Sequence, residues 1–348
     1  MKKPSAGDCA LSCCIGITMG CPVGIGPEVI LKFFATAGNM TEATAVVLGD
    51  TGVLARCARE LALDVEIVPW RAEEPLPVPR PGRVPVLALS QLPAASLEWG
   101  KPSAATGRAM AGYIEAAVRL TQQGRLSALV TAPIAKSALR LAGYSFPGHT
   151  EMLADLCDAP DYGMMMAGGR LRVVLATIHV PLAAVPASLS RSDLVRVIRL
   201  AGRSLQKDFG ISSPRIAVAG LNPHAGEGGI FGVEEQVVIG PAIEEAAAAG
   251  WVLSGPWPPD TVFHRAATGE FDAVVCMYHD QGLIPFKLLH FEDGVNVTLG
   301  LPLVRTSVDH GTAYDIAGRG LARPTSLAAA FAMAVAIARN RNSRQGAE

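Results

Sequence analysis

Three histidines each follow a short apolar run that is typical of a buried strand. His179 follows LATI, His224 follows VAGLNP and His279 follows VVCMY. A single histidine after a strand is more often a hydrogen-bonded structural residue than a ligand. Three imidazoles at strand ends, however, are donors that suit Zn²⁺, Co²⁺, Ni²⁺ or Fe²⁺, and added carboxylates would admit Mg²⁺ or Mn²⁺. We therefore predict one divalent metal ion at these histidines, with open positions that polarise a hydroxyl or carbonyl group.

Basic residues close behind the third histidine could bind an anionic group of a substrate. Lys287 and Arg305 lie in the stretch that begins with the strand of His279. Either side chain could hold a carboxylate or phosphate, arginine in bidentate fashion, although a basic loop residue is usually just solvated. Lys287 or a metal-bound water could act as the general acid or base. Asp260, which follows the prolines of GPWPPD, is a second catalytic candidate.

Two glycine-rich turns follow predicted strands. The first, GCPVGIGPE, lacks the order of a dinucleotide fingerprint and the Lys-Ser/Thr pair of a P-loop. A tight strand-to-helix connection explains it at least as well as phosphate binding does. The second, NPHAGEGG, would be costly in backbone entropy unless something must approach it closely, which favours a functional role for the loop of His224.

The elements that would position these residues alternate between strand and helix. The chain predicts a first strand at Ile15 to Met19, a helix opening at Pro27-Glu28 and a long helix opening at Ser103. His149-Thr150-Glu151 opens a further helix, for which Thr150 is a suitable cap. Such alternation is typical of an α/β fold whose parallel sheet is covered by helices on both faces.

Composition excludes several classes of protein. The chain has 348 residues, of which 50% are hydrophobic and 18% charged, and its formal net charge is −1. This is a globular composition with no field for nucleic acid or for an anionic membrane. No apolar run reaches the length of a transmembrane helix. A small-molecule substrate is the expected partner.

Seven cysteines are scattered without the paired spacing that thiolate zinc sites favour. An odd, scattered set is expected to be reduced, which indicates a cytoplasmic protein. The first residues faintly resemble a signal peptide, but Asp8 interrupts them and a first strand explains the apolar part better.

These residues also carry a family resemblance. The chain resembles the 4-hydroxythreonine-4-phosphate dehydrogenase family of vitamin B6 synthesis, whose wider relatives are the isocitrate and isopropylmalate dehydrogenases. The resemblance extends from about Ile15 to about Ile337 and rests on six motifs: TMGCPVGIGPE, FPGHTEMLA, NPHAGEGGIFGVEE, GPWPPDTVF, YHDQGLIPFK and VNVTLGLPLVRTSVDHGTAYDIAGRG.

The resemblance implies a fold and a division of the chain. The expected fold is a two-domain α/β fold with a parallel or mixed sheet of the isocitrate/isopropylmalate dehydrogenase-like type. Residues 1–140 and 300–348 would form the nucleotide-side domain, and residues 141–299 the metal, substrate and dimerisation domain. A homodimer with its active site near the subunit interface is implied, and the apolar run MMMAGGRLRVVLA is predicted to offer surface for it.

The resemblance also assigns roles to individual residues. It implies metal ligation by the three histidines already singled out. It implies substrate contacts from five residues: His149, Thr150, Lys287, Asn296 and Arg305. The cofactor would be NAD or NADP, held near His310, Gly311 and Asp315. Cys21 departs from the pattern, because it stands where the family usually has an acidic residue, as in side branches of the family that act on other substrates.

We therefore predict a metal-dependent NAD dehydrogenase that oxidises a 3-hydroxy acid, with loss of CO₂ from the resulting 3-keto acid. The favoured substrate is 4-phosphorylated, such as 4-hydroxythreonine 4-phosphate or 4-phosphoerythronate or threonate, because the pocket residues offer several donors to a phosphate. The alternative is the terephthalate cis-dihydrodiol. Two other classes stay open: a non-catalytic small-anion binding protein, and a phosphotransferase or acyltransferase that uses the GIGPE turn.

Overall fold

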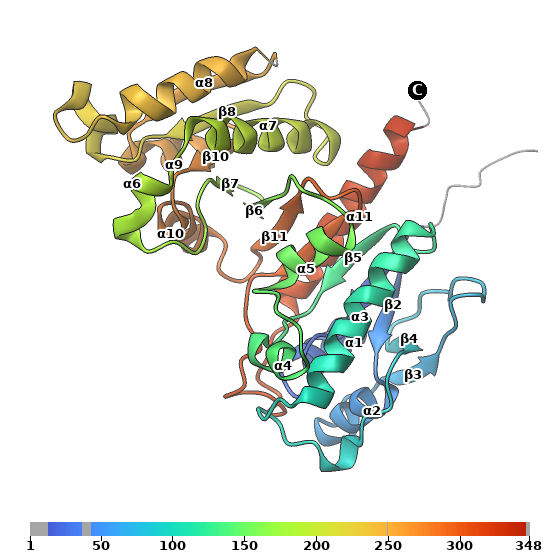
Figure 1. Cartoon of the computed structure of the whole chain (residues 1–348). Helices are drawn as coiled ribbons and strands as arrows, with labels where there is room; N and C mark the ends of the chain where they lie inside the picture. Colours follow the sequence, from blue (N-terminus) through green and yellow to red (C-terminus); the bar gives the residue numbers. More distant parts are fainter. Residues whose placement is uncertain (1–12, 37–42, 249, 346–348) are drawn as a thin grey trace, which may run out of the picture. The chain divides into compact units, whose positions relative to one another are not determined.

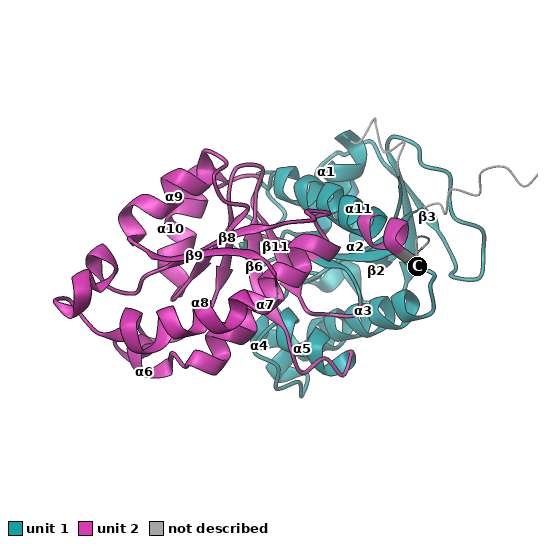
Figure 2. Cartoon of the chain, turned by 90° about the horizontal axis from the view of Figure 1, so that it is seen from above, with its two compact units in different colours: residues 1–156, 303–305, 310–339 teal, residues 157–302, 306–309, 340–348 magenta. Residues whose placement is uncertain are grey.

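The computed structural model describes residues 13–36, 43–248 and 250–345. By internal contacts the chain divides into two units, shown in Figure 2. Unit 1 comprises residues 1–156, 303–305 and 310–339, and unit 2 comprises residues 157–302, 306–309 and 340–348. The sequence-based division at 140/141 and 299/300 differs from this one mainly in residues 141–156, which lie in unit 1.

Unit 1 contains a parallel sheet in the order β3-β4-β2-β1-β5. Its strands β1 and β2 are buried along their whole length, as expected for strands covered on both faces. Figure 2 shows α1 and α11 on one side of these strands and α3 on the other. The elements are β1 (Cys14–Thr18), α1 (Gly26–Thr36), β2 (Thr44–Gly49), α2 (Thr51–Glu60), β3 (Glu66–Pro69), β4 (Arg83–Ala88), η1 (Ala94–Ser96), α3 (Ala104–Gln122), β5 (Ala128–Thr131), α4 (Lys136–Leu141), α5 (His149–Leu156) and α11 (Thr325–Gln345), whose last turns belong to unit 2.

Unit 2 contains a mixed sheet in the order β12-β11-β6-β7-β10-β8-β9. The strands from β12 to β7 run antiparallel to their neighbours, whereas β7, β10, β8 and β9 are parallel. The parallel strands lie between α9 and α10 on one side and α7 and α8 on the other (Figure 2). The elements are β6 (Gly163–Ala167), β7 (Arg172–Leu175), η2 (Leu182–Ala184), α6 (Val185–Ser188), α7 (Arg191–Lys207), β8 (Arg215–Ala219), η3 (Pro223–Gly229), η4, a π-helix (Glu235–Ile239), α8 (Gly240–Ala247), β9 (Val252–Trp257), α9 (Pro259–Ala267), β10 (Ala273–Cys276), α10 (His279–Leu289), β11 (Val295–Leu299) and β12 (Arg305–Val308), whose first residue belongs to unit 1.

The predicted α/β fold with helices on both faces of its sheets is confirmed in both units (Figure 1). The first strand lies where the sequence predicts it, and α3 begins after a capping box formed by Ser103 and Thr106. Thr150 is not a cap, because the backbone is already helical at His149. None of the helices in the described residues combines the length and hydropathy that a membrane span requires.

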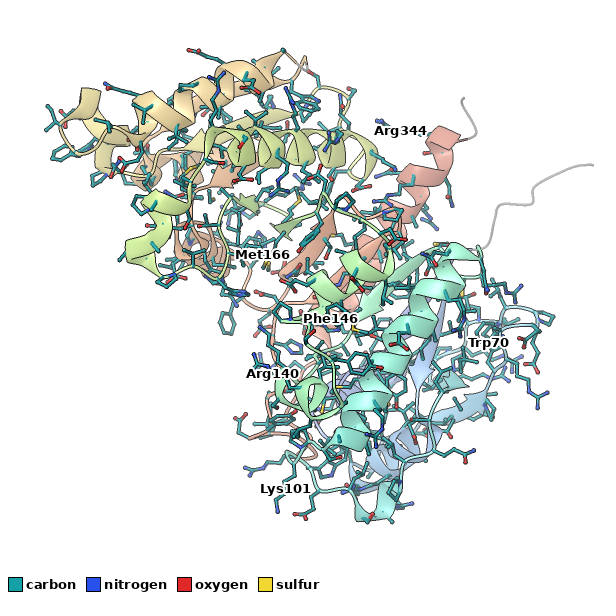
Figure 3. The ribbon with its side chains drawn as sticks, viewed as in Figure 1. Trp70, Lys101, Arg140, Phe146, Met166 and Arg344 are labelled. Carbon is teal, nitrogen blue, oxygen red and sulfur yellow. The ribbon has the colours of Figure 1, made fainter. Side chains whose placement is uncertain are left out.

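One predicted surface is wrong. The run MMMAGGRLRVVLA forms most of β6 and β7, and Met166 and Val173 are fully buried in the core of unit 2 (Figure 3). Helix α7 contacts both strands and α10 contacts β7, so their apolar side chains are covered within the same chain. This run therefore offers no surface to a second subunit.

Candidate functional site

The three strands that precede the histidines are neighbours in unit 2. β10 pairs in parallel with β7 on one side and with β8 on the other. His179 follows β7, His279 follows β10 as the first residue of α10, and His224 follows β8 within η3. Because parallel strands end at the same edge of a sheet, all three histidines come from one edge, the place where open α/β sheets bind ligands.

Two of these histidines lie side by side. The ring centres of His179 and His279 are 6.0 Å apart with 34° between the ring planes. Both line a cavity of about 240 Å³, together with Ile178, Leu182 and Asp280 among others. A metal ion about 2.1 Å from a nitrogen of each ring would separate the ring centres by roughly 5 to 6.4 Å. The pair therefore fits as two ligands of one ion.

A carboxylate stands behind one ring of the pair. His279 Nδ1 and Asp280 Oδ1 are 2.7 Å apart, and the Asp280 side chain is largely exposed. A proton on Nδ1 would be donated to this carboxylate, which leaves the lone pair of Nε2 available to a ligand. A carboxylate in this place fixes the orientation of the ring.

His224 lies in an unusual backbone segment. Five consecutive residues from His224 to Gly228 have φ between 42° and 80°, and three of them are not glycine. Each non-glycine residue in this left-handed region costs about 1–2 kcal/mol. The ring lies 6.1 Å from that of Phe231. Within residues 13–36, 43–248 and 250–345, no three His, Cys, Asp or Glu side chains are grouped closely enough to hold a metal ion, so His224 does not complete the pair in this structure.

Lys287 and Asn296 are the two predicted substrate contacts in unit 2. Lys287 Nζ forms an ion pair with Asp309 Oδ2 at 3.1 Å, and about 40% of the Lys287 side chain is exposed. Asn296 lies on β11, and its buried Oδ1 has no hydrogen-bond partner among the described residues. A buried carbonyl without a partner is costly and favours a donor from outside the chain.

In unit 1, Arg305 is a buried cation held by a threonine. Arg305 is only 3% exposed, and its Nε and Nη2 donate to Thr131 Oγ1 at 3.2 and 2.8 Å. Burial lowers the pKa of the guanidinium to about 10, and the charge of Glu151 opposes that shift. The group stays protonated at neutral pH, so unit 1 keeps a positive charge inside the protein.

His149 and Thr150, the remaining predicted substrate contacts, begin α5 in the same unit. Burial, followed by the charge of Arg305, holds the pKa of His149 well below its ordinary value of 6.5. Although part of the residue reaches the surface, its Nε2 is buried and has no partner among the described residues. A neutral imidazole with an unused nitrogen beside a buried cation is an environment suited to an anion.

The first glycine turn of unit 1 packs against the segment predicted to hold the nucleotide. Ile25 N donates to Thr312 O at 3.1 Å, and Cys21 Sγ lies 3.3 Å from Tyr314 Oη. Cys21 is fully buried, which raises the pKa of its thiol. A Cβ at Gly26 would lie 2.2 Å from Met19 O, so close packing alone requires that glycine.

The predicted cofactor residues lie at or near the surface of unit 1. His310 Nδ1 lies 3.1 Å from Gly311 O, and Asp315 is exposed. The end of this segment is held by α1. Glu28 Oε1 accepts from Ala322 N at 2.8 Å, and Lys32 Nζ donates to the carbonyls of Gly320 and Ala322 at 2.7 Å.

Some residues beside the predicted ones could not be singled out from the sequence. Thr131 ends β5 opposite Thr18 of β1 in the sheet register, and the buried Thr18 Oγ1 has no partner in the described chain. Both are threonines at the end of a buried strand, which is the only sequence signal they carry. Asp260, by contrast, is an exposed residue in the first turn of α9, where a carboxylate favours the helix dipole.

The chain is similar in sequence to proteins of one known family. A family model described as "Pyridoxal phosphate biosynthetic protein PdxA" matches residues 41–334. A 4-hydroxythreonine-4-phosphate dehydrogenase of Desulforapulum autotrophicum is 53% identical over 322 residues, which cover 92% of this chain and 94% of that protein.

Solved structures give two further comparisons. The 4-hydroxythreonine-4-phosphate dehydrogenase of Klebsiella pneumoniae superposes with a TM-score of 0.87 at 42% identity and covers 95% of this chain and 99% of its own. A terephthalate 1,2-cis-dihydrodiol dehydrogenase of Burkholderia xenovorans superposes with a TM-score of 0.63 at 31% identity, with 93% and 98% coverage.

Proposed function

This chain belongs to the PdxA family of pyridoxal phosphate biosynthetic proteins and is a dehydrogenase, and we propose that it uses NAD to oxidise a 4-phosphorylated 3-hydroxy acid. The most similar relatives above are named for 4-hydroxythreonine 4-phosphate, which we propose as the substrate, with 4-phosphoerythronate or threonate as close variants. Membership in a family of dehydrogenases sets aside the non-catalytic and phosphotransfer alternatives.

The buried charge of Arg305 is the main observation in favour of a substrate with an anionic end. Arg305 is 3% exposed, its guanidinium donates to Thr131 Oγ1, and His149 beside it is uncharged because burial lowers its pKa. A buried guanidinium next to a neutral imidazole offers an anion a bidentate donor. We assign Arg305, His149 and Thr150 to the anionic end of the substrate, because a phosphate offers three acceptor oxygens.

We propose that His179, His224 and His279 hold the divalent metal ion. The side-by-side pair His179 and His279 supports two of these ligands, and the shared sheet edge supports the third. A bound Zn²⁺, Co²⁺, Mg²⁺, Mn²⁺, Ni²⁺ or Fe²⁺ would supply Lewis acidity toward the oxygen that is oxidised. Asp280 would keep Nδ1 of His279 protonated and its Nε2 available.

Proton transfer is assigned to Lys287. Its pairing with Asp309 holds the ammonium in place, and a lysine in such a pair can donate or accept a proton at the substrate oxygen. Asn296 would donate or accept a hydrogen bond at the same substrate, because its buried Oδ1 lacks a partner in the described chain. The exposed position of Asp260 on α9 favours Lys287 over Asp260 for this step.

NAD is proposed to bind unit 1 near His310, Gly311 and Asp315, with NADP as the variant. When bound, it would accept the hydride from the carbon that carries the oxidised hydroxyl. The turn of Cys21 and Gly24 supports this segment through Thr312 and Tyr314. The 3-keto product of such an oxidation is prone to lose CO₂, so we propose decarboxylation as the following step.

A homodimer is part of the proposal, with a different surface from the buried β6–β7 run. Ile284, Leu288 and Phe291 are 67%, 85% and 78% exposed; the first two lie one turn apart on α10, and Phe291 follows the end of that helix. Exposed large apolar side chains close together in the chain favour contact with a second copy of it. A cytoplasmic location is proposed from the cysteines, none of which is in a disulfide among the described residues.

The terephthalate cis-dihydrodiol remains the second candidate, supported by the 31% identical relative. Rates of NADH formation with added metal separate the two: kcat/KM is measured for 4-hydroxythreonine 4-phosphate, for its dephosphorylated form and for the dihydrodiol. We expect removal of the phosphate to lower kcat/KM by a factor of about 30 or more. Equal values with and without phosphate, or preference for the dihydrodiol, would contradict the proposed substrate.

A further inference from the structure

A buried side-chain amide connects two of the strand ends that carry histidines. Gln281 lies in the first turn of α10 and is 6% exposed. Its Oε1 accepts from Met277 N at 2.7 Å, and its Nε2 donates to Gly220 O at 2.7 Å. Met277 follows β10 and Gly220 follows β8, so the amide joins these strands just beyond the point where their own pairing ends.

The third strand end is tied to the same point. Thr177 follows β7, and both its N and its Oγ1 donate to Met277 O, at 3.2 and 2.7 Å. Both backbone polar groups of the fully buried Met277 are therefore used, one toward Thr177 and one toward Gln281. The strand ends that precede His179, His279 and His224 thus form one hydrogen-bonded chain.

A second buried group holds the start of the His224 loop. Glu235, the first residue of the π-helix, is 4% exposed, and its Oε1 accepts from Leu221 N and Asn222 N at 2.8 and 2.7 Å. Its Oε2 accepts from Asn222 Nδ2 at 3.0 Å. The chain is therefore fixed on both sides of Gly220 before it enters the left-handed segment.

We propose that Gln281 is a positioning residue that sets the spacing between His279 and His224, and so the affinity of the metal site. The inference rests on the proposed metal ligands. An amide meets both needs without a change of protonation, because its oxygen accepts from a backbone N–H and its nitrogen donates to a backbone carbonyl. Loss of either bond leaves a buried backbone group unpaired, and the two strand ends can then relax apart.

The test uses two substitutions at this position. Gln281→Met removes both hydrogen bonds at similar volume, whereas Gln281→Glu keeps an acceptor for Met277 N but sets a carboxylate oxygen against Gly220 O. Co²⁺ affinity is measured by titration of the metal-free full-length chain at a temperature where every variant is folded. We expect both variants to bind Co²⁺ roughly 10- to 100-fold more weakly than the unsubstituted chain, the range typical of lost support behind metal ligands.

A matched control separates positioning from general stability. Asn340 Nδ2 donates to Asp208 O at 2.7 Å, a bond of the same type and length in the same unit. Asn340→Leu removes one such bond and should lower the melting temperature, by less than Gln281→Met, which removes two, while it leaves Co²⁺ affinity unchanged. Thr177→Val keeps the main-chain bond to Met277 O and removes the other, so it is a milder variant of the same network and should lower Co²⁺ affinity by a few-fold.

The outcomes are distinct. The positioning role is wrong if the folded Gln281 variants bind Co²⁺ with normal affinity. If those variants do not fold, normal affinity in Thr177→Val decides the matter in the same way. An equal loss in Asn340→Leu overturns it as well, because affinity would then follow stability alone. If the unsubstituted chain binds no Co²⁺, the proposed metal site itself fails, and the inference fails with it.

Discussion

Replacing Arg305 by methionine should change the stability of the protein little while it removes phosphate binding. Burial lowers the pKa of Arg305 from 12.5 to about 10, which corresponds to a cost of about 3 kcal/mol for keeping the charge inside the protein. Methionine removes that cost. It also removes the interactions of the guanidinium, including two hydrogen bonds to Thr131 Oγ1 of about 1 kcal/mol each and the attraction to Glu151. Because these losses offset the gain, the free energy of unfolding should change by no more than about 1 kcal/mol.

Phosphate binding, by contrast, should weaken strongly. A phosphate held by a buried guanidinium loses about 2–5 kcal/mol when that partner is removed, which weakens binding by a factor of about 30 or more. Unfolding in urea gives the stability, and isothermal titration with inorganic phosphate and KM for the phosphorylated substrate give the binding.

Arg172→Met is the matched control for this experiment. Burial also lowers the pKa of Arg172, but its Nη1 donates to Asp272 O in unit 2, away from the predicted substrate residues in sequence. Its replacement should leave phosphate affinity unchanged. An Arg305→Met variant that loses more than about 2 kcal/mol of stability and keeps normal phosphate affinity would show that the buried charge is structural, and the reasoning would be wrong.

Four further outcomes are expected. Between pH 6.5 and 5.5 the free energy of unfolding should fall with falling pH, because His149 takes up a proton in the unfolded chain but not when it is buried. In urea titrations, His149→Gln should reduce this dependence of the free energy of unfolding on pH. An unchanged dependence would contradict the buried neutral imidazole. His279→Ala should lose bound metal and most turnover while it keeps its circular dichroism spectrum, so normal metal content would refute the ligand assignment. Lys287→Met should lower kcat by about 100-fold or more with KM little changed, and a pH–rate profile identical to that of the unsubstituted enzyme would exclude proton transfer by this residue. Leu288→Glu should shift the sedimentation coefficient to that of a monomer, whereas an unchanged dimer would place the interface elsewhere.

Strand positions could be predicted from the sequence because each buried strand is an apolar run with a polar residue behind it. The three histidines were recognisable for that reason, and the structure shows that their strands are adjacent and parallel. The order β7-β10-β8 itself could not be read from the chain, because it depends on how helices return each strand to the sheet. Periodicity also gave no sign that helices α7 and α10 would cover the Met166 run.

The supporting residues were beyond sequence reasoning for a different reason. Gln281, Glu235 and Thr131 act through hydrogen bonds to groups distant in sequence, and their residue types alone predict solvent-exposed positions. The left-handed backbone at His224 was equally hidden, because non-glycine residues adopt it only when surrounding contacts hold them there. The glycines of NPHAGEGG indicated an irregular loop, but they did not indicate that its backbone would be left-handed.

The path of the chain between the two units has a consequence for synthesis on the ribosome. Helix α11 supplies Leu327, Phe331 and Ile337 to the core of unit 1. The ring centres of Phe331 and of Phe33 on α1 are 5.2 Å apart. Unit 1 therefore combines residues before 157 with residues of α11, whereas most of unit 2 is one continuous insertion between them, residues 157–302. During synthesis, residues 157–302 of unit 2 can fold before α11, the helix that packs against α1, has been made. A chain that terminates before α11 would therefore expose the apolar side chains of unit 1 that α11 normally covers. We expect such a chain to be recognised by chaperones and proteases through unit 1.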